Sequence, residues 1–357
     1  MKFHGIDMQG QYVSEVVTSL PAASLIDESR DIIYNGKKYY CDGANWIEYI
    51  STIFYESIYG YNVGGGLDSS FFSSIDRITF PFDSGTADYV GDLSGSKHTT
   101  STCNSTNYGF CMSGRDEVRV SDVDRLTFPF DSGTASQVGS LSGSRNGASG
   151  CNSTDYGYSI VGWNGTIYFS TIDRITFPFD SGTADYVGDL NSTRNASFSC
   201  NSTSYGFSGG GYSGTTISTI NRIEFPFASG TSSIVGSLSG ARYNPSGCNS
   251  SDYGFSSGGF LVVSTYYSII DRVTFPFDSG SAIFVGSLSV SKQLTAGYNS
   301  TQYGYVIGGK SSFGDDSSIE RFMFPFNSGT AFHSGNLNTS KYGASGIDKT
   351  DFVSLFI

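Results

Sequence analysis

The chain has 357 residues, 38% of them hydrophobic, which is enough apolar content to bury a large core and argues against a disordered protein. Its 20 Lys and Arg against 32 Asp and Glu give a formal net charge of −12, which repels nucleic acid and anionic lipid, so neither is expected as a partner. No apolar run reaches the roughly 18 residues of a membrane span, and the first residues lack the apolar stretch of a signal peptide. We therefore expect synthesis in a cytosol without export by that route.

The N-terminal residues are expected to stand apart from the rest of the chain. We predict an attachment segment at residues 1–22 and one repeat domain at residues 23–357. Side chains alternate along residues 1–14 in a way that suits a strand added to another subunit. We expect these residues to protrude from the same face as the variable loops described below.

The rest of the chain is a repeat. The stretch IDRITFPFDSGTADYVGDL occurs identically at residues 75–93 and 172–190, with weaker copies around it. Short runs rich in aromatic and β-branched residues alternate with Gly, Ser, Asn and Asp, and no amphipathic helix pattern is present. A period near 50 built from four short strands predicts an all-β fold, a β-propeller with one four-stranded blade per repeat. The arginines that mark the period are Arg77, Arg125, Arg174, Arg222, Arg272 and Arg321.

One repeat shows the expected order of strands within a blade. GASGCNST (147–154) is predicted as the innermost strand and its turn, YGYSIVGW (156–163) as the second, IDRITFPF (172–179) as the third and TADYVGDL (183–190) as the outer one. Proline has no N–H, so Phe-Pro-Phe should interrupt the third strand's ladder, and the following Asp-Ser-Gly should form a turn. The recurring Asn-Ser-Thr fits a glycosylation sequon, but we expect its Asn to serve the inner-strand turn.

The ends of the chain predict the number of blades. Each repeat arginine precedes the next repeat tyrosine by 31 residues, and the same step from Arg321 reaches Phe352. Residues 24–40 align with 73–89 at an offset of 49, although they lack Phe-Pro-Phe. We therefore expect seven blades, the last closed by two C-terminal and two N-terminal strands. The alternative is six blades with the N-terminal hairpin as a separate anchor.

These motifs resemble known repeat proteins. The second strand YGYVIGG (303–309) resembles the kelch motif without its outer-strand Trp, and the repeat IDRITFPFDSGTA…VGDLS resembles propeller repeats of bacteriophage and other viral virion proteins, particularly tail fibres. The opening MKFHGIDMQG…IIYNGKKYYCDGANW is similar to N-terminal segments of phage structural proteins. The resemblance implies a virion protein, oligomeric in its assembly, that binds other virion proteins through its N-terminal segment. It implies no catalytic residues.

Residues that recur in every blade are expected to be structural. Cys103, Cys151, Cys200 and Cys248 occupy one repeat position where other blades have Phe54, Tyr298 and Ile347, which indicates packing rather than a metal site. The acid-Arg pair that begins at Asp76 and Arg77 should tie blade to blade through charge-assisted hydrogen bonds. The single Asp of each DSGT loop is too few ligands for a convincing Ca²⁺ site, an alternative that is left open.

All the length variation falls between the second and third strands, where the loop sequences also differ most. A constant scaffold with variable loops on one face is how a rigid fold presents recognition, and exposed aromatic and Arg side chains are the usual anchors. The candidate binding residues are Phe71, Phe72, Arg115, Arg119, Trp163, Tyr168, Phe260, Tyr266, Tyr267 and Phe313.

Two classes of function remain. The first is a non-enzymatic virion protein, a tail-fibre or appendage module that displays a propeller for recognition of a host surface glycan or protein or for particle assembly. A head or tail decoration protein with a purely structural role is its variant. The second is a propeller glycan hydrolase, which needs acidic pairs from different blades, whereas Asp315 and Asp316 are adjacent and should point apart. We expect no enzyme activity, no cofactor and no metal.

Overall fold

The computed structural model describes residues 58–262 and 265–349 with their side chains, and residues 15–16, 31–34, 37–41, 46–48, 51–57 and 350–356 as backbone strands. The chain divides into two units, Met1–Glu56 with Phe352–Ile357, and Ser57–Asp351. The first unit contains a sheet in which β1 (Glu15–Val16) runs parallel to β2 (Asp31–Tyr34), followed by β3 (Lys37–Cys41) and β4 (Trp46–Glu48).

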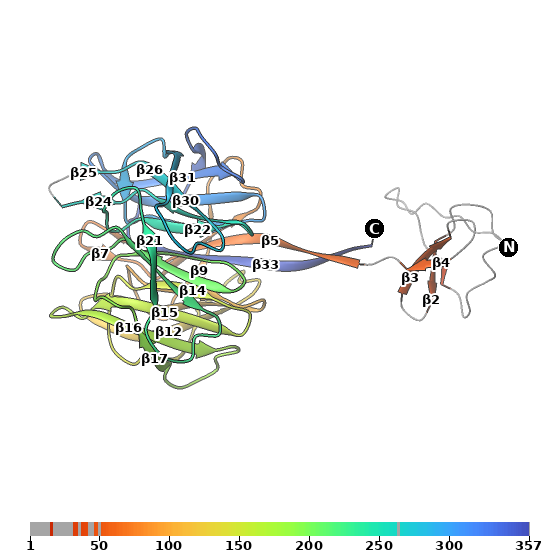
Figure 1. The fold of residues 1–357 in the computed structure, drawn as a ribbon, viewed down its shortest axis with the longest axis horizontal. Coiled ribbons are helices and arrows are strands. Elements are labelled where there is room, and N and C mark those ends of the chain that lie inside the picture. Colours follow the sequence, from red (N-terminus) through yellow and green to blue (C-terminus); the bar gives the residue numbers. More distant parts are fainter. Residues whose placement is uncertain are drawn as a thin grey trace. The chain divides into compact units, whose positions relative to one another are not determined.

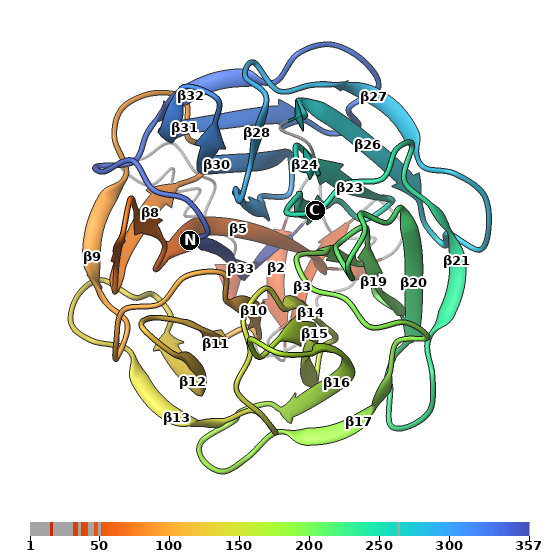
Figure 2. The same ribbon diagram turned by 90° about the vertical axis from the view of Figure 1, so that its left-hand side faces the viewer.

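The second unit is a β-propeller of six four-stranded blades around a central axis (Figure 2). Blade 1 consists, from the axis outward, of β33 (Ser345–Phe356), β5 (Ser51–Val63), β8 (Ser74–Thr79) and β9 (Asp88–Asp92). Blade 2 consists of β10 (Ser101–Asn104), β11 (Tyr108–Arg115), β12 (Arg119–Thr127) and β13 (Ser136–Ser140). Blade 3 consists of β14 (Ser149–Asn152), β15 (Tyr156–Trp163), β16 (Tyr168–Thr176) and β17 (Asp185–Asp189).

The other three blades repeat this order. Blade 4 consists of β18 (Phe198–Asn201), β19 (Tyr205–Gly209), β20 (Thr219–Glu224) and β21 (Ser233–Ser237). Blade 5 consists of β22 (Ser246–Asn249), β23 (Tyr253–Ser257), β26 (Ile269–Thr274) and β27 (Ile283–Ser287). Blade 6 consists of β29 (Ala296–Asn299) with β28 (Lys292–Gln293), β30 (Tyr303–Ser311), β31 (Gly314–Met323) and β32 (Phe332–Asn336). Two small hairpins, β6 (Gly66–Leu67) with β7 (Ser70–Phe71) and β24 (Phe260–Leu261) with β25 (Thr265–Tyr266), extend blades 1 and 5.

The predicted order of strands within a blade is confirmed, but the expected count of seven blades is wrong and the alternative of six is correct. Strands β2 and β3, which lie within or overlap the aligned residues 24–40, pair in the sheet of the first unit and not in a blade. The C-terminal strand β33 is the inner strand of blade 1, beside β5. The repeat array begins at a second strand and ends with an inner strand, so its two ends complete one blade and leave none over. The predicted domain boundary between residues 22 and 23 lies outside the described residues.

The third strand of each blade ends where the sequence predicted. In blade 3, β16 stops at Thr176 and the Phe177–Pro178 peptide bond that follows is cis, as it is in all six Phe-Pro-Phe motifs. In the inner-strand turn, however, the structure assigns the roles differently from the prediction. Ser105, not Asn104, forms the turn by accepting the N–H of Tyr108 at 3.2 Å, while the N–H of Asn104 donates to Oδ1 of Asn152 in the next blade.

The turn after Phe-Pro-Phe joins each blade to its neighbour. The N–H of Asp92 in blade 1 donates to the carbonyl of Gly133 in blade 2 at 2.9 Å, and the N–H of Ala135 returns to the carbonyl of Asp92 at 2.8 Å. The same pair recurs at every boundary, including Asn336 of blade 6 with Gly85 and Ala87 of blade 1. The ring is therefore closed at its rim by main-chain hydrogen bonds.

The repeat arginine adds a second tie across the same boundary, as predicted. Arg77 of blade 1 bonds Asp131 of blade 2, and equivalent bonds join Arg125 to Asp180, Arg222 to Asp278, Arg272 to Asn327 and Arg321 to Asp83. Blade 3 is the exception, because Ala228 stands where the others have Asp or Asn. Arg174 instead reaches the carbonyl of Phe227 at 3.4 Å and Asp185 of its own blade at 3.6 Å.

The sequence predicts that the acid before each repeat arginine also ties blade to blade, but this acid instead makes a buried contact within its own blade. It pairs with the basic residue of the connection that enters the same blade, and the side chains of the Arg145–Asp173 pair, at 2.8 Å, are almost wholly buried. The others are Lys97–Asp124, Arg242–Asp271, Lys292–Glu320, Lys341–Asp76 and the neutral variant Arg194–Asn221. Without a carboxylate beside it, burial lowers the pKa of Arg194 to about 10.

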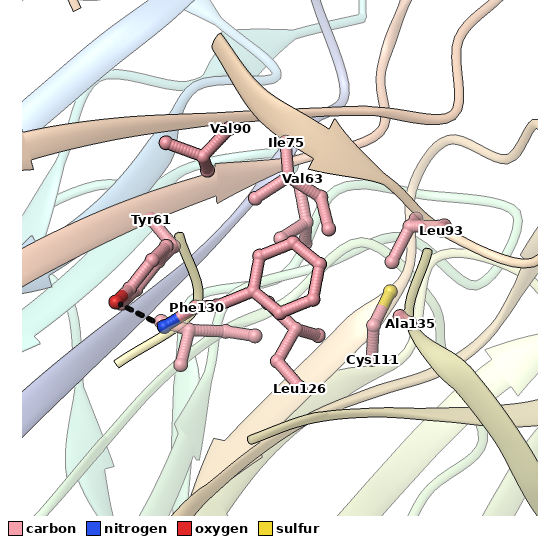
Figure 3. Close-up of a cluster of buried hydrophobic side chains, with 10 residues drawn as sticks. Tyr61, Val63, Ile75, Val90, Leu93, Cys111, Leu126, Phe130 and Ala135 are labelled. Atoms are coloured by element: carbon pink, nitrogen blue, oxygen red, sulfur yellow. Dashed lines mark hydrogen bonds between the residues drawn. The ribbon is translucent and has the colours of Figure 1, made fainter. Parts of the chain in front are cut away.

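The hydrophobic core is divided among the boundaries between blades. Between blades 1 and 2, Val63, Ile75 and Leu93 pack against Leu126 and Phe130 (Figure 3). The hydroxyl oxygen of Tyr61 lies at this boundary too, where it accepts the N–H of Phe130 at 3.0 Å, and burial raises the pKa of Tyr61 to about 12. Because each cluster draws on two blades, no blade buries both of its faces alone.

Closure by β33 predicts a large effect of truncation. Removing residues 345–357 deletes the inner strand of blade 1, including the buried Ile347, and exposes the axis. We expect the melting temperature of the propeller, followed by circular dichroism, to fall by roughly 10 °C or more. Removing residues 1–50, which belong to the other unit, is the control and should leave that transition in place. Equal melting temperatures for the first truncation and the parent would contradict the assignment of β33.

The exception in blade 3 predicts a stabilising substitution. Ala228→Asp supplies Arg174 with the partner that its equivalents have, and an exposed ion pair contributes about 0.2–1 kcal/mol to the free energy of unfolding. A double-mutant cycle with Arg174→Gln isolates the new interaction in urea denaturation. A coupling energy of zero would indicate that an Arg–Asp bond at this position of the rim contributes nothing to the free energy of unfolding.

Candidate binding face

The axis is closed on one face by a ring of main-chain hydrogen bonds. The residue two positions before each inner strand donates its N–H to the carbonyl of the equivalent residue in the preceding blade, at 2.6–3.0 Å, and the sixth bond closes the ring. All six residues have φ between 52° and 66°, although only two are glycine. They are Thr99, Gly147, Ala196, Asn244, Leu294 and Gly343.

Behind this ring the inner strands enclose a polar cavity of about 160 Å³. The strands approach closely, because a Cβ at Gly150, Gly247, Gly297 or Gly346 would clash with the carbonyl of the preceding blade. At the far end the cavity is lined by five Asn and, in β33, by Asp348. Burial raises the pKa of Asp348 to about 7.

The four repeat cysteines are packing residues, as predicted. Each thiol fits against the glycine of the Tyr-Gly-aromatic motif in the next blade, as Cys103 does at Gly157 and Cys151 at Gly206. Tyr298 and Ile347 fill the position in the other two blades, at Gly60 and Gly109. The side chain of Phe54 lies outside the described residues. Within the described part of the chain no three His, Cys, Asp or Glu side chains gather around one point.

The loops between second and third strands form one face of the propeller, called here the hairpin face (Figure 2). Strand β5 runs toward this face from Ser57, and β33 runs away from it toward Asp351, so the chain joins the propeller at the opposite face (Figure 1). The sequence predicts that residues 1–14 protrude beside the variable loops; these residues lie outside the described part of the chain.

Four of the ten candidate residues belong to a row of half-exposed rings, and two more, Arg115 and Arg119 of the β11–β12 hairpin, lie where this row begins. The guanidinium of Arg119 lies 4.2 Å from the ring centre of Trp163, which stacks on Tyr168 at 6.1 Å. The contacts then continue from ring to ring. The distances between ring centres are 5.9 Å for Tyr168–Tyr212, 5.5 Å for Tyr212–Tyr243, 5.5 Å for Tyr243–Phe260 and 4.8 Å for Phe260–Tyr266. Arg115 lies opposite Arg119 in the hairpin. This aromatic arc, Trp163, Tyr168, Tyr212, Tyr243, Phe260 and Tyr266, spans blades 3 to 5.

The other four candidates lie elsewhere. Phe71 stacks on His98 at 4.3 Å in a separate cluster with Tyr342. The carbonyls of Phe72 and Tyr267 accept the N–H of the repeat's basic residues Lys97 and Lys292, so these two belong to the scaffold. Phe313, at the tip of the β30–β31 hairpin, is 93% exposed and touches none of the arc.

The residues predicted from the sequence did not include Tyr212, Tyr243, His98 and Tyr342. Tyr243, His98 and Tyr342 follow the repeat's basic residue in the connection between blades, a position that pairs with the hairpin in every blade. Its identity varies as much as the loops do, from His98 and Asn146 to Tyr243 and Tyr342. Because this one position varies within an otherwise constant motif, the sequence could have identified it as a candidate binding position.

The half of the hairpin face over blades 6 and 1 is charged. Lys310 pairs with Asp315 at 3.1 Å and lies over the ring of Tyr342, whose hydroxyl donates to the carbonyl of Asp68. Asp316, the neighbour of Asp315 on β31, bonds the buried Lys292 at 3.0 Å, so the two adjacent acids point apart, as predicted. The acid pair that a glycosidase needs is not formed here.

Comparisons with known proteins bear on the fold. No family model matches the chain, and no curated protein matches it. Among the solved structures that are similar, one titled "Structure of YjhT" has a TM-score of 0.60 over 76% of this chain and 98% of that chain, at 10% identity. At this identity the similarity concerns the fold alone, and the protein is a six-bladed β-propeller whose function must be argued from its surface.

The buried thiols predict chemical inertness. Burial raises the pKa of Cys111 to about 11 and that of Cys151 to about 12, and it raises the pKa values of Cys103, Cys200 and Cys248 as well, so the reactive thiolate is scarce at pH 8. In a Cys41→Ser variant we expect no thiol to react quickly with a disulfide reagent in the native state and five to react in denaturant. Any fast native thiol would contradict the packing described above.

Proposed function

We propose that this protein is a non-enzymatic recognition module that displays its hairpin face to a ligand on a host surface, a glycan or a protein. The observation that carries the proposal is the aromatic arc. The six blades share one scaffold, yet among the described residues blades 3 to 5 carry a continuous row of six half-exposed rings, which is longer than the cluster of Phe71, His98 and Tyr342. Aromatic side chains that keep one face in water are the usual anchors of binding surfaces.

The direction of the chain supports the same function. The chain enters and leaves the propeller at the face opposite the hairpins, so the arc and the two chain connections lie on opposite faces of the propeller. The likeness of the repeat to kelch-like propellers of phage virions supports a setting in which the N-terminal residues attach to other virion proteins, in a tail fibre or surface appendage with several copies. The rigid ring then holds the arc in place without loss of conformational entropy on binding.

Substitutions in the arc test this function. We expect Trp163→Ala and Tyr212→Ala each to weaken binding to a glycan array or to intact bacterial cells by at least tenfold, because a central aromatic anchor contributes about 2 kcal/mol or more. Tyr186→Ala is the control, since Tyr186 is 56% exposed on the outer strand β17, away from the arc. All three variants should melt within a few degrees of the parent. Binding equal to wild type for both arc variants would refute the proposal.

A further inference from the structure

The arc begins at two arginines that face each other. Arg115 ends β11 and Arg119 begins β12, and the two are direct partners in the antiparallel register. Side chains of such partners lie on the same side of the hairpin, where two like charges destabilise it. Burial lowers the pKa of Arg119, and the charge of Arg115 lowers it further.

No carboxylate of the described residues forms an ion pair with either arginine, in a protein that carries an excess of acids. Among the described residues, the Arg119 side chain makes one hydrogen bond, from Nε to Oδ1 of Asn146 at 3.0 Å, and neither of its Nη groups is bonded. Nε of Arg115 is buried and has no hydrogen-bond partner in the described part of the chain. Elsewhere in the repeat, arginines bond Asp, Asn or main-chain carbonyls.

Arg119 is held in place without being neutralised. Its guanidinium lies over the ring of Trp163 in the next blade and close to Gly165, where an added Cβ would come within 2.8 Å of Nη1. An arginine fixed by stacking presents its remaining donors in a constant direction, which suits the planar, bidentate binding of an oxyanion.

The rest of the arc offers apolar ring faces and neutral amides. Asn195 bridges in the main chain to Tyr212, in the middle of the arc. The half-exposed ring faces match a ligand that has apolar C–H faces beside polar groups, and sugars have both.

We propose that the hairpin face binds an anionic glycan, with the guanidinium groups of Arg115 and Arg119 holding a carboxylate or sulfate and neighbouring sugar rings stacking on Trp163, Tyr168 and Tyr212. This inference rests on the proposed function and specifies its ligand. The anion relieves the repulsion between the two arginines, and the aromatic row sets the direction of the sugar chain.

Calorimetric titration with four probes tests it: an oligosaccharide rich in uronic acid, a sulfated oligosaccharide, a neutral oligosaccharide and a polyglutamate peptide. We expect the wild type to bind at least one anionic oligosaccharide tenfold or more tightly than the neutral one and the peptide, and to lose affinity with added salt. Arg115→Gln and Arg119→Gln should each remove most of this preference. Lys310→Gln, which makes the same charge change on the same face at a residue already paired with Asp315, should change affinity less than twofold.

The melting temperatures of the variants and the binding of the other probes show whether this inference or the proposed function fails. Because the two arginines repel each other, Arg115→Gln should not lower the melting temperature, whereas a purely structural Arg115 would lower it without a change in the anionic preference. Equal binding of neutral and anionic oligosaccharides, both lost in Trp163→Ala, would overturn this inference and leave the proposed function standing. Polyglutamate binding as tight as that of the glycans would overturn the choice of a glycan. If no probe binds but Trp163→Ala still reduces cell binding, only the inference fails; if neither occurs, both fail.

Discussion

Each blade has two apolar faces, and only a neighbour on both sides can bury them, so the structure depends on closure of the ring. The core consists of clusters shared between adjacent blades, such as the one that joins Val63 and Ile75 to Phe130. Three sets of repeated bonds hold adjacent blades together: the main-chain hydrogen bonds at the rim, the Arg–Asp bonds beside them, and the main-chain hydrogen bonds that join six residues in a ring at the axis. In the last of these, Thr99, Ala196, Asn244 and Leu294 accept a left-handed conformation that costs about 1–2 kcal/mol per residue, and the hydrogen bonds and packing offset it.

This closure explains why identical stretches of sequence recur. Residues 75–93 and 172–190 lie at equivalent places in blades 1 and 3, where equivalent strands surround them, although Arg77 meets Asp131 and Arg174 has Ala228 at that position. A cysteine in one blade needs a glycine in the next, as Cys103 needs Gly157, so the motifs are constrained in pairs across boundaries. A substitution such as Ala228 is tolerated where the contact is at the exposed rim, since surface ion pairs contribute little.

The symmetric ring also leaves one region free to differ. Hairpin tips and the residues after the basic position contribute little to the boundaries, so their side chains can vary without opening the ring. Over blades 3 to 5 they form the aromatic arc, and over blades 6 and 1 they form a charged cluster around Tyr342. Arg115 and Arg119, at one end of the arc, are placed where their mutual repulsion has no structural compensation in the described residues.

The sequence by itself determined the propeller class, the strand order within a blade, the packing role of the cysteines and the inter-blade role of the repeat arginines, because each follows from a local pattern repeated at a fixed period. It did not determine the number of blades. The match of residues 24–40 to a blade was only partial, and pairing between distant strands such as β5 and β33 depends on which edge remains unpaired when the ring closes. Nor did it bring Tyr212 and Tyr243 to Trp163 and Phe260, since residues from different blades and different connections become neighbours only when the blades are set around one axis.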